Sequence, residues 1–120
     1  MSILGRGYQP FGPKEDGLVS FMYSVVIENS REAGYFTEKI VDACLCRTVP
    51  IYWGAPDIGD YFDVEGVIVC QSAQDILAAI KSISSNDYEA RHDAIKRNVI
   101  FAKKYADVEM RAALEVLSND

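Results

Sequence analysis

The feature that most constrains the fold is an alternation of short apolar runs with longer amphipathic segments. Residues 23–28 read Tyr-Ser-Val-Val-Ile-Glu, residues 49–53 read Val-Pro-Ile-Tyr-Trp, and a shorter run of the same kind covers 67–70. Runs this short, rich in β-branched and aromatic residues, are typical of strands buried on both faces. Because helix-length segments separate them, the sequence predicts an α/β fold. We expect a three-layer arrangement, a parallel sheet with helices on both faces and right-handed crossovers.

The first half of the chain contains one clear helix signal. Thr37 can cap a helix that runs to about Arg47. Ahead of it, residues 1–5 resemble the end of a strand, and residues 14–21 resemble a short helix. The inner face of the helix after Thr37 should carry Ile40, Ala43 and Cys44.

Further helices are expected in the second half. Ser72 and Asp75 have the spacing of a capping box, and Asn86 and Glu89 repeat it ahead of a long helix to about residue 105. A separate last helix is expected at about 108–118. Apolar residues at helical spacing support the first and the last of these helices: Ile76, Ile80 and Ile83 in one, and Met110, Ala113, Leu114 and Leu117 in the other.

Size, charge and cysteine content exclude several classes of protein. A chain of 120 residues, 49% apolar and 25% charged, fits one globular domain. Its formal net charge of −6 argues against binding to nucleic acid or to an anionic membrane surface. Three cysteines without a secretory signal, and no apolar run of membrane-spanning length, predict a cytoplasmic protein. Cys44-x-Cys46 lacks the second ligand pair of a metal site, so no metal is expected.

The best candidate site is the loop after residue 28 and the helix that starts near Thr37. Ligands of open parallel sheets bind beyond the carboxyl ends of the strands, against helix N-termini. A helix N-terminus attracts anions, and Lys39 in the first turn adds a positive charge, which together suit a diphosphate. Asn29 can donate an amide hydrogen bond, and Glu38 can accept from sugar hydroxyls. The same residues also fit a plain turn followed by an ordinary, solvated first helical turn.

The stretch 21–62 resembles the C-terminal half of the α1,3/4-fucosyltransferases of glycosyltransferase family 10. Two separated motifs carry the resemblance: Glu-Asn-Ser at 28–30 with Tyr-Phe-Thr-Glu-Lys at 35–39, and Thr-Val-Pro-Ile-Tyr-Trp-Gly at 48–54. Members of that family have a GT-B architecture, in which a Rossmann-like C-terminal domain binds GDP-fucose. The reaction inverts the anomeric centre and needs no metal. The resemblance therefore implies a single nucleotide-sugar-binding domain over residues 1–120, with no cofactor beyond its sugar-nucleotide substrate.

The resemblance also assigns roles to individual residues. Lys39 would hold the diphosphate, and Glu38 would stabilise the oxocarbenium-like charge on the sugar. Asn29 and Tyr35 would contact the nucleotide. The expected donor-binding residues are Asn29, Ser30, Tyr35, Thr37, Glu38 and Lys39.

Other residues receive simpler interpretations. Residues 50–54 are expected to be strand core and a tight turn, with Gly54 leaving room for backbone near the ligand. Asp57, Asp60 and Asp63 form either a solvated acidic loop or part of the wall of an interdomain cleft. His92 is expected on the surface.

Two parts of the family pattern are missing from this sequence. The general base of the family is a glutamate of the N-terminal acceptor domain, which has no counterpart here. A diphosphate-binding arginine also precedes the matched region, and Arg6 occupies a different motif position. We therefore expect a donor-binding unit that is incomplete for catalysis alone and that meets a glycan acceptor only with an additional domain.

Three alternatives remain at this point. The chain could be one subunit of a split transferase that is complemented by an N-terminal domain on another polypeptide. It could be a non-catalytic nucleotide-binding or protein-interaction module, or it could be part of a longer enzyme. The face that would meet the other lobe could also support a homodimer.

Overall fold

The structure is a computed structural model that describes residues 21–118, with side chains described as far as Val108. The strand expected at 1–5, Arg6, and the helix expected at 14–21 (apart from Phe21) lie outside the described residues. Three strands form the sheet: β1 (Tyr23–Ile27), β2 (Val49–Trp53) and β3 (Ile68–Val69). All pairings are parallel and the order is β1-β2-β3. The three predicted strands are thus confirmed, the third in a shorter form.

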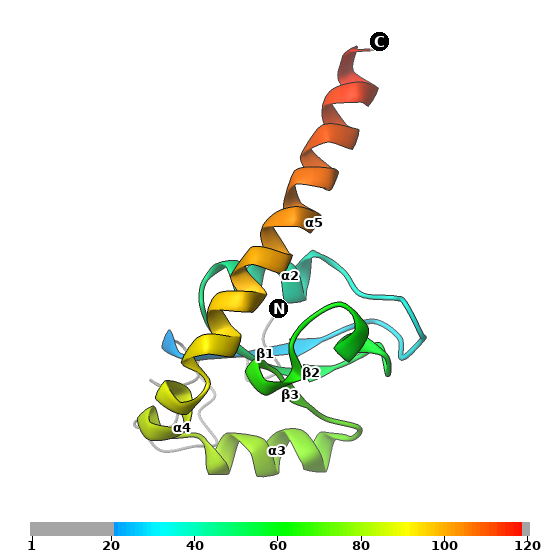
Figure 1. The fold of residues 1–120 in the computed structure, drawn as a ribbon. Helices are drawn as coiled ribbons and strands as arrows, with labels where there is room; N and C mark the ends of the chain where they lie inside the picture. Colours follow the sequence, from blue (N-terminus) through cyan, green and yellow to red (C-terminus); the bar gives the residue numbers. More distant parts are fainter. Residues whose placement is uncertain (1–20, 119–120) are drawn as a thin grey trace, which may run out of the picture.

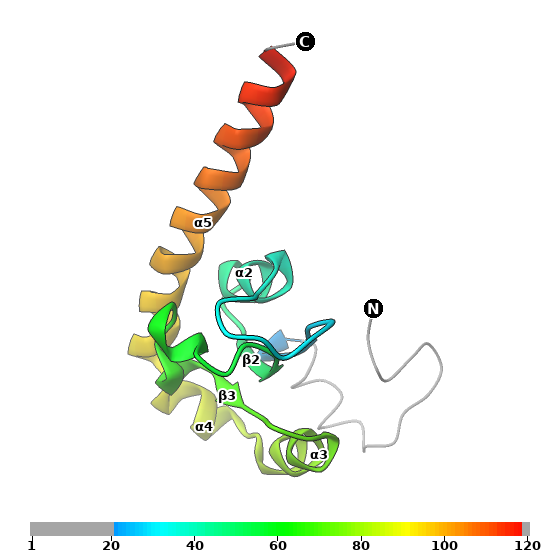
Figure 2. The same cartoon turned by 90° about the vertical axis from the view of Figure 1, so that its right-hand side faces the viewer.

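Helices cover both faces of this sheet, as Figures 1 and 2 show. Helices α2 (Glu38–Leu45) and α5 (His92–Ser118) lie on one face, and α3 (Ala73–Ser82) lies on the other. Alternate residues of each strand pack against the helices on opposite faces, because successive strand side chains point to opposite faces of the sheet. Val26 and Tyr52 pack in the core under α2 and α5, whereas Ile51 packs in the core with α3. The predicted α/β fold class is confirmed.

The prediction for α2 is also correct. Thr37 is the N-cap, and its hydroxyl accepts from the Lys39 backbone N–H at 3.3 Å. Ile40 and Cys44 are buried on the inner face, while Cys46 is exposed after the helix end. Burial raises the pKa of the Cys44 thiol to about 12, so this cysteine stays protonated and acts as a small core residue.

The predicted boundaries of the last helices are wrong. Helix α4 (Ser85–Ala90) is capped by Ser84, which accepts from the Asp87 N–H at 3.0 Å, and not by Asn86. Arg91 then leaves the helical conformation, and its guanidinium donates to Asp87 and to the Glu65 carbonyl. In the sequence, Ser84 and Asp87 have the same capping spacing as Asn86 and Glu89. The buried Tyr23 hydroxyl donates to Asp87 at 2.6 Å, and this contact favours the helix start at Ser84.

Helix α5 continues from His92 to Ser118 where two helices were expected. No glycine or proline occurs in this segment, so nothing in the sequence interrupts the backbone hydrogen bonds. His92 is exposed at the start, as predicted. A helix of 27 residues is about 40 Å long, and its far end projects beyond the sheet (Figure 1).

Candidate functional site

The candidate site is built around a buried carboxylate at the end of β1. Glu28 is only 3% exposed. Its oxygens accept from the Thr37 N–H at 3.0 Å, the Thr37 hydroxyl at 2.7 Å and the Tyr52 hydroxyl at 3.1 Å. The Tyr52 hydroxyl in turn accepts from the Ala55 N–H at 3.1 Å. Glu28 therefore joins the end of β1, the start of α2 and the loop after β2 in one network, the Glu28 network.

Tyr52 is held in its protonated form by this arrangement. Burial raises the pKa of its hydroxyl, and the neighbouring Glu28 carboxylate raises it further, although the Ala55 N–H acts in the opposite direction. A protonated hydroxyl can donate to Glu28, which the carboxylate needs because it is withdrawn from water. The buried polar groups of the Glu28 network therefore have hydrogen-bond partners within the protein, without a ligand.

Gly54 is required by the same network. A Cβ atom at this position would lie 2.5 Å from Glu28 Cγ and 2.5 Å from the Tyr52 hydroxyl oxygen. The expectation that Gly54 leaves room for backbone near a ligand is therefore wrong, since the atoms it makes room for belong to the protein. The packing role expected of residues 50–54 is correct, because Pro50, Ile51 and Tyr52 are fully buried.

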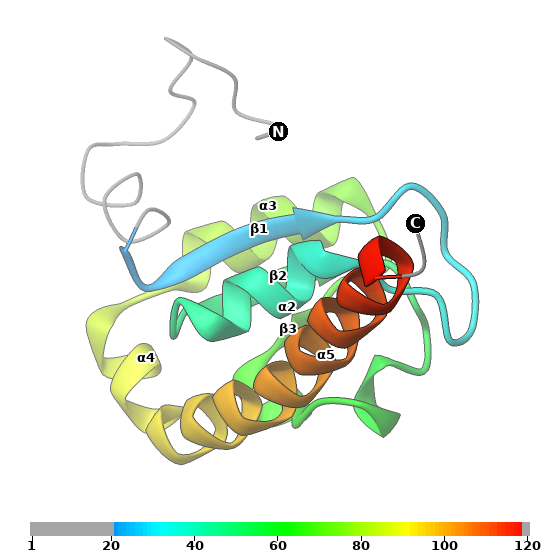
Figure 3. The ribbon, with the colours of Figure 1, turned by 90° about the horizontal axis from the view of Figure 1, so that it is seen from above.

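The loop between β1 and α2 is anchored on its outer side as well. The Gly34 N–H donates to an Asp57 carboxylate oxygen at 2.8 Å, and Gly34 has a φ of 75°, which favours glycine. Phe36 packs against the rings of Tyr61 and Tyr105, with centroid distances of 5.0 and 5.3 Å. These contacts give the loop a defined path into α2, as seen from above in Figure 3.

The acidic loop after β2 has varied contacts. Asp57 binds Gly34, and Asp63 accepts from the Glu65 N–H at 2.9 Å and from the Arg97 guanidinium at 2.7 Å. Asp60 is exposed. Of the two interpretations left open, a purely solvated acidic loop is wrong for Asp57 and Asp63, because both hold neighbouring segments in place.

The expected donor-binding residues divide into two groups. Asn29, Glu38 and Lys39 are exposed around the start of α2. The Lys39 ammonium donates to the Ile27 carbonyl at 3.3 Å, which places its charge at the end of β1. Among residues 21–108, whose side chains the structure describes, no hydrogen bond involves the Asn29 or Glu38 side chains.

Ser30, Tyr35 and Thr37 have contacts within the protein or are partly covered. The Ser30 hydroxyl donates to Glu32 at 2.8 Å, and Tyr35 is half-buried. Thr37 is the cap of α2, and its hydroxyl donates to Glu28. The structure therefore gathers all six expected residues at one end of the sheet and shows a structural role for Thr37.

The sequence interpretation missed Glu28, Tyr52 and Phe36 as residues that shape the site. One signal was present: Glu28 directly follows a run of apolar strand residues, a position where a carboxylate is either solvated or tightly bonded. The partners of Glu28 lie 9 and 24 residues away in sequence, so its hydrogen bonds could not be inferred from local spacing.

The residues around α2 have the character of an anion site. The first N–H groups of a helix carry partial positive charge, and Lys39 adds a full charge beside them. Within the part of the chain that the structure describes, no group of three or more His, Cys, Asp or Glu side chains could hold a metal ion. No helix in that part is long and apolar enough to cross a membrane.

Comparison with solved structures identifies the fold class. The fold matches crystal structures of α1,3-fucosyltransferase, one with GDP-fucose at a TM-score of 0.55 and one with GDP at 0.54, each at 24% identity. The matches cover 83% and 82% of this chain but only 36% and 35% of those chains. The protein thus shares the fold of about one third of a fucosyltransferase.

Sequence relatives of the chain point to the same class of protein as the structural matches. The sequence is 36% identical over 55 residues (46% of this chain) to the α-(1,3)-fucosyltransferase FucT of Helicobacter pylori. It is 30% identical over 70 residues (56% of this chain) to a putative fucosyltransferase of Acanthamoeba polyphaga mimivirus. Each match spans 12% of the relative. No protein-family model matches. The chain is fucosyltransferase-like in both sequence and fold.

Proposed function

We propose that this chain binds a nucleotide-sugar donor of the GDP-fucose type at the N-terminus of α2. The observation that carries the proposal is the Glu28 network, which fixes the β1–α2 loop while Asn29, Glu38 and Lys39 stay exposed around it. Such a site is organised before a ligand arrives, which lowers the entropy cost of binding. A fucosyltransferase structure with the same fold contains GDP-fucose, which supports this choice of donor.

The diphosphate is the part of the donor that this site suits best. The N–H groups at the start of α2, apart from the Lys39 N–H that Thr37 caps, and the Lys39 ammonium would contact its oxygens. Asn29 and Tyr35 would contact the nucleoside, with Ser30 and Thr37 at the margin of the site. The ammonium of Lys39 would exchange its bond to the Ile27 carbonyl for a stronger, charge-assisted bond to phosphate.

In the transfer step, an acceptor hydroxyl oxygen would form a bond to the anomeric carbon as the bond to the diphosphate breaks. The geometry would be in-line, so the anomeric configuration would invert. GDP would leave with its charge stabilised by Lys39 and the helix end, and Glu38 would stabilise the positive charge on the ring. The acceptor proton would pass to a base supplied by a complementing N-terminal domain.

Thermal denaturation with and without GDP or GDP-fucose tests the proposal. Each ligand should raise the Tm of the wild-type chain, because a ligand that binds only the folded state stabilises it. Lys39→Ala should abolish the shift. Lys81→Ala, which removes an exposed lysine from the last turn of α3, should keep it. Equal shifts for the two variants would contradict the proposed site.

A further inference from the structure

The tip of the β1–α2 loop is tied to the rest of the chain through Asp57. Within residues 21–108, the 2.8 Å bond from the Gly34 N–H to the Asp57 carboxylate is the one hydrogen bond that joins residues 29–35 to another segment. The other hydrogen bonds of these residues stay within the loop. The tip therefore depends on a single bond for a fixed orientation.

Asp57 does not have the local role that its position predicts. It is the N-cap residue of the short 3₁₀ helix η1 (Ile58–Asp60), and an aspartate at an N-cap normally accepts from the first N–H groups of its own helix. No such side-chain bond forms here. The carboxylate instead accepts from the N–H of Gly34, 23 residues away in the sequence. This partner indicates that Asp57 orders the loop and not its own helix.

The backbone that carries Asp57 is itself well anchored. Ile58, the next residue, is 1% exposed, and its N–H donates to the Ala55 carbonyl at 3.2 Å. Ala55 in turn belongs to the Glu28 network through the Tyr52 hydroxyl. The segment after β2 thus holds the β1–α2 loop at two points: at its base through Tyr52 and Glu28, and at its tip through Asp57.

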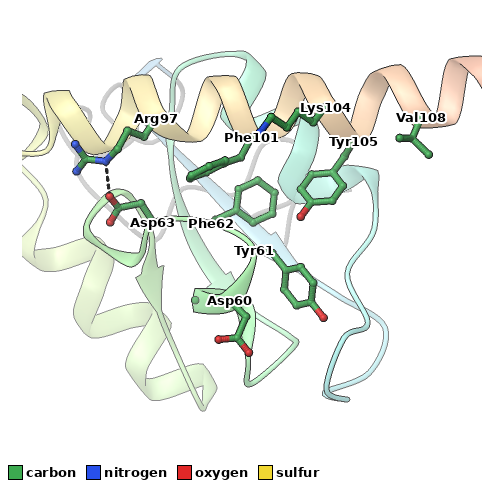
Figure 4. Close-up of a pocket in the computed structure, with 10 residues that line it drawn as sticks. Asp60, Tyr61, Phe62, Asp63, Arg97, Phe101, Lys104, Tyr105 and Val108 are labelled. Atoms are coloured by element: carbon green, nitrogen blue, oxygen red, sulfur yellow. Dashed lines mark hydrogen bonds and ion pairs between the residues drawn. The ribbon is translucent and has the colours of Figure 1, made fainter.

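The aromatic contacts of the loop do not replace this bond. Phe36 packs against Tyr61 and Tyr105, which also line a cavity of about 600 Å³ between residues 59–63 and α5 (Figure 4). Apolar contacts are non-directional, and a cavity beside the rings gives them room to shift. A hydrogen bond to a backbone N–H has a preferred direction. The orientation of the tip therefore depends on Asp57 more than on the rings.

We propose that Asp57 is a positioning residue for the nucleotide-sugar donor, on which it acts through Gly34 and not by direct contact. Asn29 and Tyr35 lie at the two ends of the segment that Asp57 holds, and they are the residues that would contact the nucleoside. A fixed tip keeps both side chains in place before the ligand arrives, so that binding does not include the entropy cost of ordering the loop. This inference rests on the proposed function.

An effect of charge alone predicts the opposite result. Burial is the main reason why the pKa of the Tyr52 hydroxyl is raised, but the negative charge of Asp57 contributes, so this charge acts within the site. Such a charge repels a diphosphate, and its removal alone would strengthen GDP binding. Asparagine separates the two effects, because its side-chain oxygen can accept from the Gly34 N–H without carrying a charge.

Titration of the full chain and three variants with GDP tests the proposal. Asp57→Ala should weaken GDP binding about tenfold, because a hydrogen bond to a charged group is lost. Asp57→Asn should bind GDP within about threefold of the wild-type chain, because it retains the acceptor. Asp60→Ala is the matched control. It removes an exposed carboxylate from the same segment, one that makes no hydrogen bond within residues 21–108, and should bind GDP like the wild-type chain.

Backbone order parameters from ¹⁵N relaxation, measured without GDP, test the loop itself. A rigid backbone gives an order parameter S² of about 0.85, and a flexible one gives less than about 0.6. Residues 31–35 should be rigid in the wild-type chain, in Asp57→Asn and in Asp60→Ala. They should become flexible in Asp57→Ala.

Three results would overturn the role of Asp57: GDP affinity unchanged in Asp57→Ala, an equal loss of affinity in Asp57→Ala and Asp60→Ala, or tighter GDP binding by both Asp57 variants. Failure of the donor site is distinguishable from these results. No form of the chain would then bind GDP, which would contradict a role in donor binding. Flexibility of the loop in Asp57→Ala alone would still support Asp57 as the residue that holds the tip.

Discussion

The motif at residues 28–39 contains two pairs of residues that differ in burial and in hydrogen bonding. Glu28 and Thr37 are bonded to each other and to Tyr52, so their polar groups are satisfied within the protein. Glu38 and Lys39 follow immediately in the chain and are exposed. The motif thus combines a buried group that fixes the loop with an exposed group, which we propose contacts the ligand. The two glutamates, Glu28 and Glu38, form a matched pair for experiments.

The largest effect is expected at the buried glutamate. Glu28→Ala leaves the Thr37 N–H and hydroxyl and the Tyr52 hydroxyl without their acceptor. We expect it to lower the free energy of unfolding by about 3 kcal/mol or more. Urea denaturation measures the loss. Glu38→Ala is the matched control and should change stability by less than about 1 kcal/mol. Similar losses of stability in the two variants would contradict the distinction between the buried Glu28 and the exposed Glu38.

Gly54→Ala should have the next largest effect. The new Cβ would collide with Glu28 and Tyr52, and both belong to a fixed network that cannot move freely. Overpacking of this kind costs about 1–3 kcal/mol. Gly59→Ala is a milder control, because its nearest contact is a Val64 methyl at 3.1 Å. A Gly54 variant as stable as the Gly59 variant would show that the network tolerates displacement.

Thr37→Ala should cost less than the Glu28 change. The substitution removes the cap of α2 and one of the hydrogen bonds to Glu28. We expect it to lower the free energy of unfolding by about 1–2 kcal/mol. Thr37→Ser retains the hydroxyl and should recover most of this stability. Urea denaturation of both variants gives the comparison. A serine variant as unstable as the alanine variant would mean that the methyl group, and not the hydroxyl, matters.

The smallest effect concerns Asp63 in the acidic loop after β2. Hydrogen bonds from the Glu65 N–H and from Arg97 lower the pKa of its carboxyl below 3.8, against the opposing effect of burial. A lowered pKa in the folded state contributes stability that is present above the unfolded value and is lost as pH falls through the folded value. Asp63→Asn should therefore lose less stability than the wild-type chain on acidification below about pH 4. Parallel pH profiles of stability for the two proteins would contradict this.

The sequence was sufficient to predict the elements that local patterns determine. The three strands followed from short β-branched runs, and α2 followed from Thr37 and its apolar face. The start of α4 was predicted wrongly because its register depends on Tyr23, more than 60 residues away, which donates to Asp87. Local spacing at Asn86 and at Ser84 was equally good, and only the tertiary contact distinguished them.

The candidate site could be predicted only in part. Exposed residues such as Asn29, Glu38 and Lys39 were found because they follow a strand and begin a helix. Glu28 was overlooked because its role depends on partners from another strand, and the cavity at Tyr61 and Tyr105 depends on the path of α5. Such arrangements result from tertiary packing, which has no local sequence signal.

The central claim is that the N-terminus of α2 binds a nucleotide diphosphate. The most direct test is a titration of the ¹⁵N-labelled chain with GDP, followed through its backbone amides. We predict that the largest shifts occur at residues 29–40, and that Lys39→Ala removes them. Saturating GDP that leaves these amides unchanged, or that shifts them equally in the Lys39 variant, would contradict the claim.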